Sequence, residues 1–185
     1  TKLIFLADAE QELVRKTVNQ LAENIGDYIF AIDGLDRHQG DLVEVISKLM
    51  QQQKYNLSIQ ETASQGLMAA KCIAQSWLIS SVYKQSLQQQ TENQPIAEYK
   101  DIALGIAQNR QQQDGTDLVL VQLYAGNAEQ FQQKELSIIL FSLLLTPAGV
   151  VHSQRSIVGS KARKQNQAAI YSLDLLRRFL QNKTL

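Results

Sequence analysis

The spacing of apolar positions predicts a small β-α-β unit at the start of the chain. Residues 3–7 and 28–32 have the short apolar pattern of strands. Between them, Asp8 stands at the N-cap position of a helix, with Gln11 three residues later in a capping-box pattern. Two strands and one helix are too few to close a core, so we expect this fragment to be unable to fold alone.

A linker over residues 33–40 then leads into a second domain, predicted to span residues 41–185. Its pattern alternates strands and helices, and ends in a strand hairpin around residues 147–149 and a long helix. The expected helices cover residues 41–50, start at Pro95 and cover 161–182, and the expected strands cover 78–84, 118–124, 136–145 and 150–157. Within residues 57–70, a strand is expected to pass into a further helix. The last helix is expected to bury Ala162, Ala169, Leu173, Leu176 and Leu180. This order predicts an α/β fold, a layered domain with a mixed β-sheet flanked by helices.

Candidate chemistry lies within residues 57–70, where the expected strand passes through small polar residues into an alanine-rich helix. Thr62 and Ser64 place two hydroxyls there, and Gly66 precedes the helix. A helix N-terminus favours an anion or a developing oxyanion, because its first N–H groups have no partner within the helix. Glu61 is the carboxylate expected at this position, and we favour an orienting role, in which it accepts backbone N–H bonds, over proton transfer.

Composition excludes several classes of function. The 185 residues carry 18 basic and 18 acidic side chains, so no overall positive field exists to bind nucleic acid or an anionic membrane. No apolar run approaches the roughly 20 residues of a spanning helix. His38 and His152 have no neighbours at metal-ligand spacing, and no motif requires a cofactor. The one cysteine, Cys72, is expected to be a buried, inert thiol in a cytoplasmic protein.

Four basic residues gather near the expected start of the last helix, where the helix dipole disfavours cations. A bound anion would relieve that mismatch, and a solvated basic face is the alternative. The four are Arg155, Lys161, Arg163 and Lys164. The chain begins at Thr1, without a methionine, and is expected to be part of a longer protein.

Nearly the whole chain resembles the CinA family, and its second domain the CinA C-terminal domain, which includes nicotinamide mononucleotide amidohydrolases of the PncC type. The family's first motif reads A-E-S-C-T-G-G, and residues 60–66 (QETASQG) occupy it here. Glu61 and Gly66 are retained, the family's serine nucleophile falls on Thr62, and Ser64 replaces the motif's threonine. A threonine nucleophile is crowded by its methyl group and still requires an activating base.

The other three motifs depart further from the family pattern. The second supplies a tyrosine and a lysine that resemble an activating pair, and the alignment puts Gln85 and Gln90 there. Glutamine cannot accept a proton near neutral pH. A register shift of one or two residues would instead bring in Tyr83 or Lys84. The third, glycine-rich motif keeps one glycine over residues 123–128, and the fourth, G-D-R, becomes residues 159–161 (GSK).

These departures imply a degenerate relative of the amidohydrolases that keeps the fold and a nucleotide-binding, anion-binding or scaffolding role. Glu61, Gly66, Lys161 and Arg163 are the candidate ligand-binding residues, and a nucleotide or phosphate-bearing small molecule is the candidate ligand. The alternatives are an active amidohydrolase with Thr62 or Ser64 as nucleophile, or hydrolysis of another amide or phosphate ester. The resemblance also implies that residues 1–34 are the β-α-β remnant of a preceding linker domain. It further implies a homodimer and a molybdopterin-binding-like domain earlier in the full-length chain.

Overall fold

The chain divides into two compact units, Thr1–Asp41 and Leu42–Leu185, in a computed structural model that describes residues 11–25, 40–85 and 94–183. The first unit contributes helix α1, Gln11–Ile25, on which Val14, Val18 and Leu21 are partly buried. The predicted strands over residues 3–7 and 28–32 lie outside the described residues.

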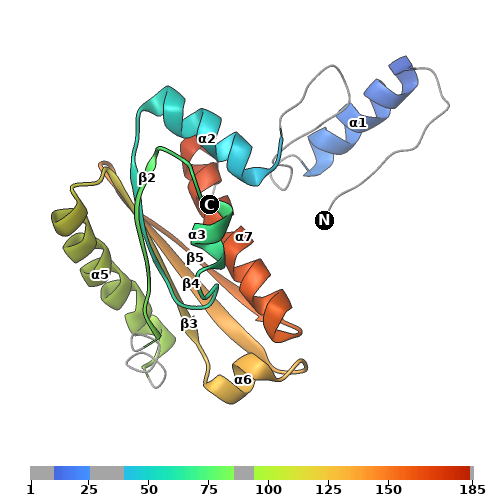
Figure 1. Ribbon diagram of the computed structural model, residues 1–185. Coiled ribbons are helices and arrows are strands. Elements are labelled where there is room, and N and C mark those ends of the chain that lie inside the picture. Colours follow the sequence, from blue (N-terminus) through green and yellow to red (C-terminus); the bar gives the residue numbers. More distant parts are fainter. Residues whose placement is uncertain (1–10, 26–39, 86–93, 184–185) are drawn as a thin grey trace. The chain divides into compact units, whose positions relative to one another are not determined.

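The second unit is a five-stranded mixed sheet with helices on both faces, which confirms the predicted α/β class (Figure 1). The strand order is β2-β1-β3-β4-β5, in which β1 pairs in parallel with β2 and β3, while β4 pairs antiparallel with β3 and β5. The strands are β1 (Leu57–Glu61), β2 (Leu78–Tyr83), β3 (Leu118–Ala125), β4 (Ser137–Thr146) and β5 (Gly149–Val158). The helices are α2 (Leu42–Gln53), α3 (Leu67–Lys71), η2 (Ile96–Glu98), α5 (Tyr99–Asp114), α6 (Ala128–Gln132) and α7 (Lys161–Leu180).

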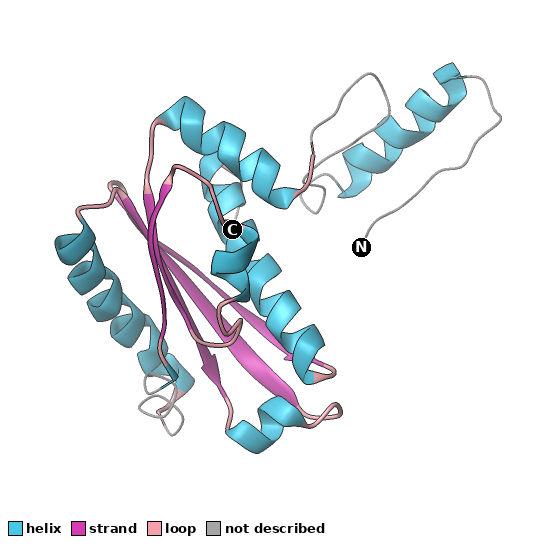
Figure 2. Cartoon of the chain, viewed as in Figure 1, coloured by secondary structure: helices cyan, strands magenta, loops and turns pink. Residues whose placement is uncertain are grey.

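One face of the sheet is covered by α2, α3 and α7 (Figure 2). Alternate strand residues such as Leu57, Leu120 and Leu144 are fully buried against these helices, as the period of two along a strand requires. Cys72 is also fully buried in this layer, as predicted. Trp77 is 4% exposed, and its indole N–H donates to Ser47 Oγ at 3.0 Å. This layer therefore contains a satisfied core tryptophan.

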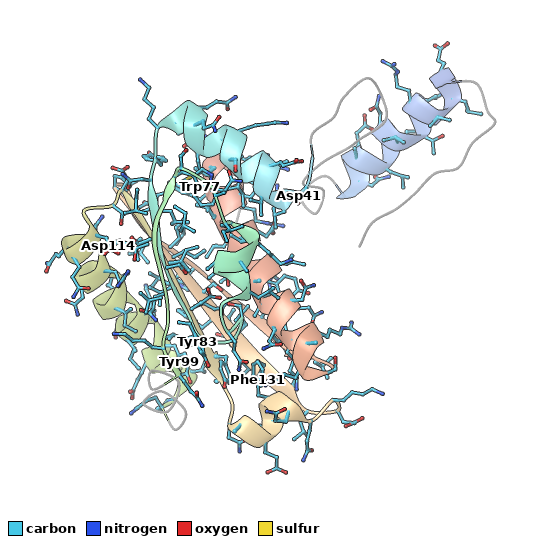
Figure 3. All side chains as sticks on the ribbon, viewed as in Figure 1. Asp41, Trp77, Tyr83, Tyr99, Asp114 and Phe131 are labelled. Atoms are coloured by element: carbon cyan, nitrogen blue, oxygen red, sulfur yellow. The ribbon has the colours of Figure 1, made fainter. Side chains whose placement is uncertain are left out.

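The opposite face is covered by α5, whose residues Tyr99, Ala103 and Ala107 are fully buried. Tyr99 packs edge-on against Phe141 of β4, with ring centroids 6.2 Å apart. Figure 3 labels Tyr99 on α5 and Trp77 in the other layer, and the sheet lies between the two helical layers. The α5 helix ends at Gly115, which takes φ +63 as the left-handed C-cap that glycine adopts without strain.

Two features differ from the sequence-based expectation. The short helix α6 follows Gly126, where only a turn was predicted. In α7, Ala162 is exposed, whereas Ala169, Leu173, Leu176 and Leu180 are buried as predicted. The prediction for Ala162 was wrong because Lys164, rather than Ala162, points into the protein in the first turns of α7.

Candidate functional site

The two candidate hydroxyls lie in the turn that joins β1 to α3. The turn spans residues 62–66, and α3 is a single short helix of five residues. Gly66 is the N-cap with φ +90, a backbone conformation that side-chain-bearing residues rarely adopt. A side chain at Gly66 would meet no heavy atom within 4 Å, so the retained glycine is required by its backbone angle and not by close packing.

A side chain of the protein itself, the carboxylate of Glu61, occupies the anion position at the N-terminus of α3. Its carboxylate accepts the backbone N–H of Met68 and of Ala69, each at 3.2 Å. Glu61 is fully buried at the end of β1. The geometry therefore agrees with the orienting role favoured from the sequence, in which the carboxylate caps the helix as a capping side chain does.

Both candidate hydroxyls are directed into the protein. Thr62 is 2% exposed, and its hydroxyl donates to the main-chain oxygen of Gln122 at 2.9 Å. Ser64 is 1% exposed; its hydroxyl bonds to the Glu61 carboxylate and lies 2.8 Å from the side-chain oxygen of Gln122. The backbone N–H of Ser64 also donates to that Gln122 oxygen, at 2.8 Å.

Gln122 connects this turn to α7 through a chain of buried polar groups. Its side-chain amide donates to the carbonyl of Ala168 at 3.1 Å and to Ser172 Oγ at 2.9 Å. Ser172 Oγ in turn lies 2.8 Å from Ser142 Oγ of β4. We call Glu61, Ser64, Gln122, Ser142 and Ser172 the polar seam. Each member is buried and hydrogen-bonded, so the seam satisfies polar groups that would otherwise be costly in this core.

The Ser64–Glu61 contact is the one arrangement here that resembles a nucleophile beside a base. The same carboxylate accepts two backbone N–H bonds, and both side chains are closed off from solvent. A substrate carbonyl would need the turn to open before it could approach the hydroxyl. In this conformation the contact supports the fold.

The residues at the family's second motif lie on and after the edge strand β2. Tyr83 is the strand partner of Glu61 in the β1–β2 register and is 42% exposed. Lys84 and Gln85 follow it and are exposed, and Gln90 lies outside the described residues. Among the described residues, the hydrogen-bond partners of the Thr62 and Ser64 hydroxyls are Gln122 and Glu61, with no lysine or tyrosine.

The candidate ligand-binding residues Lys161 and Arg163 are exposed in the first turn of α7. Ser160 caps this helix, accepting the backbone N–H of Arg163 at 3.4 Å. One turn after Lys161, the Gln165 amide donates to the side-chain oxygen of Gln65 at 2.7 Å. The structure therefore brings the start of α7 against the hydroxyl turn, with both cations on the surface.

Lys164, the last of the four basic residues named from the sequence, is buried inside the protein. Its ammonium is buried and donates to the carbonyls of Gln130 (2.5 Å), Gln133 (2.7 Å) and Phe131 (3.3 Å) at the end of α6. Burial lowers the pKa of Lys164, and the nearby Glu135 carboxylate opposes that shift. Lys164 therefore holds α6 against α7 and is not available to a ligand.

The loop at the family's glycine-rich motif is a capped helix start in this chain. Asn127 and Gln130 form a capping box, with reciprocal bonds of 2.8 Å between side chains and backbone N–H groups. Gly126 precedes it at φ +141, where an added Cβ would lie 2.9 Å from Ile138 Cγ2. Among the described residues, no cluster of three His, Cys, Asp or Glu side chains could hold a metal ion.

Sequence reasoning missed the residue that organises this region, Gln122. The available signal was a single amide in an otherwise apolar strand, and Ser142 interrupts the apolar run of β4 in the same way, while Ser172 lies on the buried face of α7. An isolated polar residue in a buried strand requires a partner, and here the three become partners of one another.

Solved structures of competence-damage proteins share this architecture. A CinA superfamily protein from Klebsiella pneumoniae superposes with a TM-score of 0.59 over 79% of this chain and 99% of that one, at 10% identity. Another, from Enterobacter cloacae, gives 0.57 over 81% and 99% at 12% identity. One from Escherichia coli gives 0.55 over 86% and 98% at 10% identity. The chain has the CinA superfamily fold.

At 10–12% identity, the likeness to CinA structures extends to the fold and leaves the chemistry of the site to be argued from its residues. No protein-family model matches the sequence, and no curated protein matches it either. In the part of this chain that the structure describes, no helix combines the length and apolar character needed to cross a bilayer.

Proposed function

We propose that this chain is a non-catalytic relative of the CinA amidohydrolases, which keeps the fold as a binding or scaffolding domain. The observation that carries the proposal is the inward direction of the Thr62 and Ser64 hydroxyls, both at most 2% exposed. A nucleophilic hydroxyl needs a base on one side and a substrate on the other. Here Gln122 and Glu61 take up the hydroxyls for internal bonds.

The residues at the expected activating positions support the same proposal. Gln85 is exposed and carries no group that could accept a proton near neutral pH. Loss of general-base assistance typically lowers a reaction rate by about 10²–10⁴-fold. A domain with these features keeps its core and loses the amidohydrolase reaction.

The ligand we propose is a nucleotide or another phosphate-bearing small molecule at the start of α7. Lys161 and Arg163 are exposed there, and Gln165 ties this helix to the hydroxyl turn. Exposed cations near a helix N-terminus are compatible with a phosphate, which the backbone N–H groups would also favour.

An active nicotinamide mononucleotide amidohydrolase is the alternative, favoured by one specific observation. Ser64 is hydrogen-bonded to a carboxylate, so opening of the turn would present a hydroxyl already paired with Glu61. In that case Ser64 would be the nucleophile and Glu61 its base.

Ammonia release from nicotinamide mononucleotide separates the two functions. The purified protein is assayed beside an active amidohydrolase as the positive control. We expect no ammonia above background; turnover that Ser64→Ala or Thr62→Ala abolishes would reject the non-catalytic function.

Calorimetric titration with a panel of nucleotides then tests the ligand. We expect heats of binding that Lys161→Ala and Arg163→Ala weaken and that the surface control Gln112→Ala, on α5, leaves unchanged. No binding across the panel would leave scaffolding as the role.

A further inference from the structure

Two consecutive residues of the turn between β1 and α3 have left-handed backbone conformations. Gly66 has φ +90, and Gln65 before it has φ +52. Glycine adopts such angles freely, whereas a residue with a Cβ is strained there. Asparagine and aspartate are the side chains that tolerate this region best, and glutamine is not among them. A strained residue therefore stands directly beside Ser64 in the turn.

The side chain of Gln65 is held in place by α7. Its oxygen accepts a hydrogen bond from the side-chain amide of Gln165 at 2.7 Å. The two residues are 100 positions apart in the sequence, and each is partly exposed to solvent. Figure 1 shows α3, which follows the turn, lying against α7. We call the hydrogen bond between Gln65 and Gln165 the clasp.

Ser64 fixes the same turn from the interior of the protein. Its backbone N–H donates to the side-chain oxygen of Gln122 at 2.8 Å, and both residues are buried. A buried hydrogen bond is shielded from water, whereas water competes for the partly exposed groups of the clasp. Because local opening begins where the hydrogen bonds of a segment face solvent, we expect the clasp to break before the Ser64–Gln122 bond.

The backbone around Gly66 has room to move. A Cβ built at Gly66 would meet no heavy atom within 4 Å, so neighbouring atoms do not enclose this position. Glycine also takes many backbone angles, which suits a hinge. Rotation at Gly66 would let Gln65 return to a right-handed or extended conformation, in which its Cβ is not strained. The strain at Gln65 thus favours an open turn, and the clasp opposes it.

We propose that the clasp is a conformational switch, which holds the turn closed against the backbone strain of Gln65. When the clasp breaks, the turn opens at Gly66 and the buried Ser64 becomes accessible to solvent. Closure of the turn is then a balance between one side-chain hydrogen bond and one strained backbone angle. The switch goes beyond the proposed function, because it operates whether or not the hydroxyls react and whether or not a nucleotide binds.

Hydrogen exchange at the backbone amide of Ser64, followed by NMR, measures this opening. Gln165→Ala removes the clasp and leaves the strain of Gln65 in place. Loss of one hydrogen bond should raise the exchange rate of the Ser64 amide about fivefold, while the amide of Leu123 in β3 keeps its rate. Asn166→Ala, at the next position of α7, is exposed and serves as the matched control. It should exchange at Ser64 as the natural protein does.

Adding Gln65→Gly to Gln165→Ala provides the decisive result. Glycine is not strained at this angle, so the turn should close without the clasp, and exchange at Ser64 should return to within about twofold of the natural rate. The proposal is overturned if Gln165→Ala leaves exchange at Ser64 unchanged or raises exchange in β3 to the same extent. It is also overturned if the double variant exchanges as fast as Gln165→Ala or faster, since glycine would then only loosen the turn.

Discussion

Replacing Gln122 with leucine tests whether the polar seam holds the hydroxyl turn in place. Leucine is close to glutamine in size, so the change removes hydrogen bonds without a large cavity. The Gln122 side chain makes four contacts of 2.8–3.1 Å. Its oxygen accepts from the N–H of Ser64 and lies close to the Ser64 hydroxyl, and its amide donates to Ala168 O and Ser172 Oγ. The seam thus loses its central member while the shape of the core is kept.

The expected cost follows from which groups lose their partners. Ser64 Oγ still bonds to Glu61, and Ser172 Oγ still bonds to Ser142. The backbone N–H of Ser64 is left buried without its acceptor, which costs about 1–3 kcal/mol. The lost bonds to α7 add about 0.5–1.5 kcal/mol each, and the gain from burying leucine offsets part of the total. We expect the free energy of unfolding to fall by roughly 2–4 kcal/mol.

Urea unfolding followed by tryptophan fluorescence measures this change, because Trp77 lies in the core of the same unit. Gln112→Leu, at an exposed position of α5, is the control and should shift stability by less than about 0.5 kcal/mol. Ser64→Ala combined with Gln122→Leu should show a coupling of about 0.5–3 kcal/mol. A Gln122→Leu protein as stable as the natural one would refute the structural role of the seam.

Three further predictions concern the groups that flank the seam. Glu61→Gln should lower the free energy of unfolding by about 1–3 kcal/mol in the same urea assay, since one end of the new amide must face a backbone N–H donor. Gly126→Ala should lower the thermal midpoint of unfolding, because the position has φ +141 and the new Cβ would lie 2.9 Å from Ile138 Cγ2. The control is Gly105→Ala on the exposed surface of α5, where the new Cβ would meet no heavy atom within 4 Å; this change should raise the free energy of unfolding by about 0.5–1 kcal/mol. The folded pKa of Lys164 is lowered by burial from 10.5, so between that lowered value and 10.5 the unfolded chain binds more protons. Stability relative to Lys164→Met should therefore rise with pH through this window, and a constant difference in urea titrations from about pH 7 to about pH 10 would contradict the lowered pKa.

The fold could be predicted because its strands carry strong local patterns. Residues 118–124 and 136–145 are nearly continuous apolar runs, typical of strands buried on both faces, and the turn at residues 147–149 sets the hairpin between β4 and β5. Helix α6 was missed because Gly126 and Asn127 were interpreted as a turn alone, although Gln130 completes a capping box three residues after Asn127.

The direction of the hydroxyls could not be predicted from the same local patterns. Residues 57–70 indicate a strand, a turn and a helix, but the partners of Thr62 and Ser64 come from β3, about 60 residues along the chain. Gln122 faces them only because β1 and β3 pair in parallel with Gln60 beside Val121. Such a contact depends on the register between strands, which a single sequence does not determine.

Gln122 also explains how the fold can hold the β1–α3 turn in place through structural contacts alone. A side-chain amide carries both a donor and an acceptor, so in the central strand it can satisfy the turn on one side and α7 on the other. With these bonds made, the turn is held by neutral internal contacts and by the carboxylate of Glu61, which fixes α3. Retention of Glu61 and Gly66 then follows from the backbone of the turn, since one caps the helix and the other takes its positive φ. Retention of these two residues is therefore compatible with a turn under structural constraint alone, and catalysis has to be judged from what the hydroxyls contact.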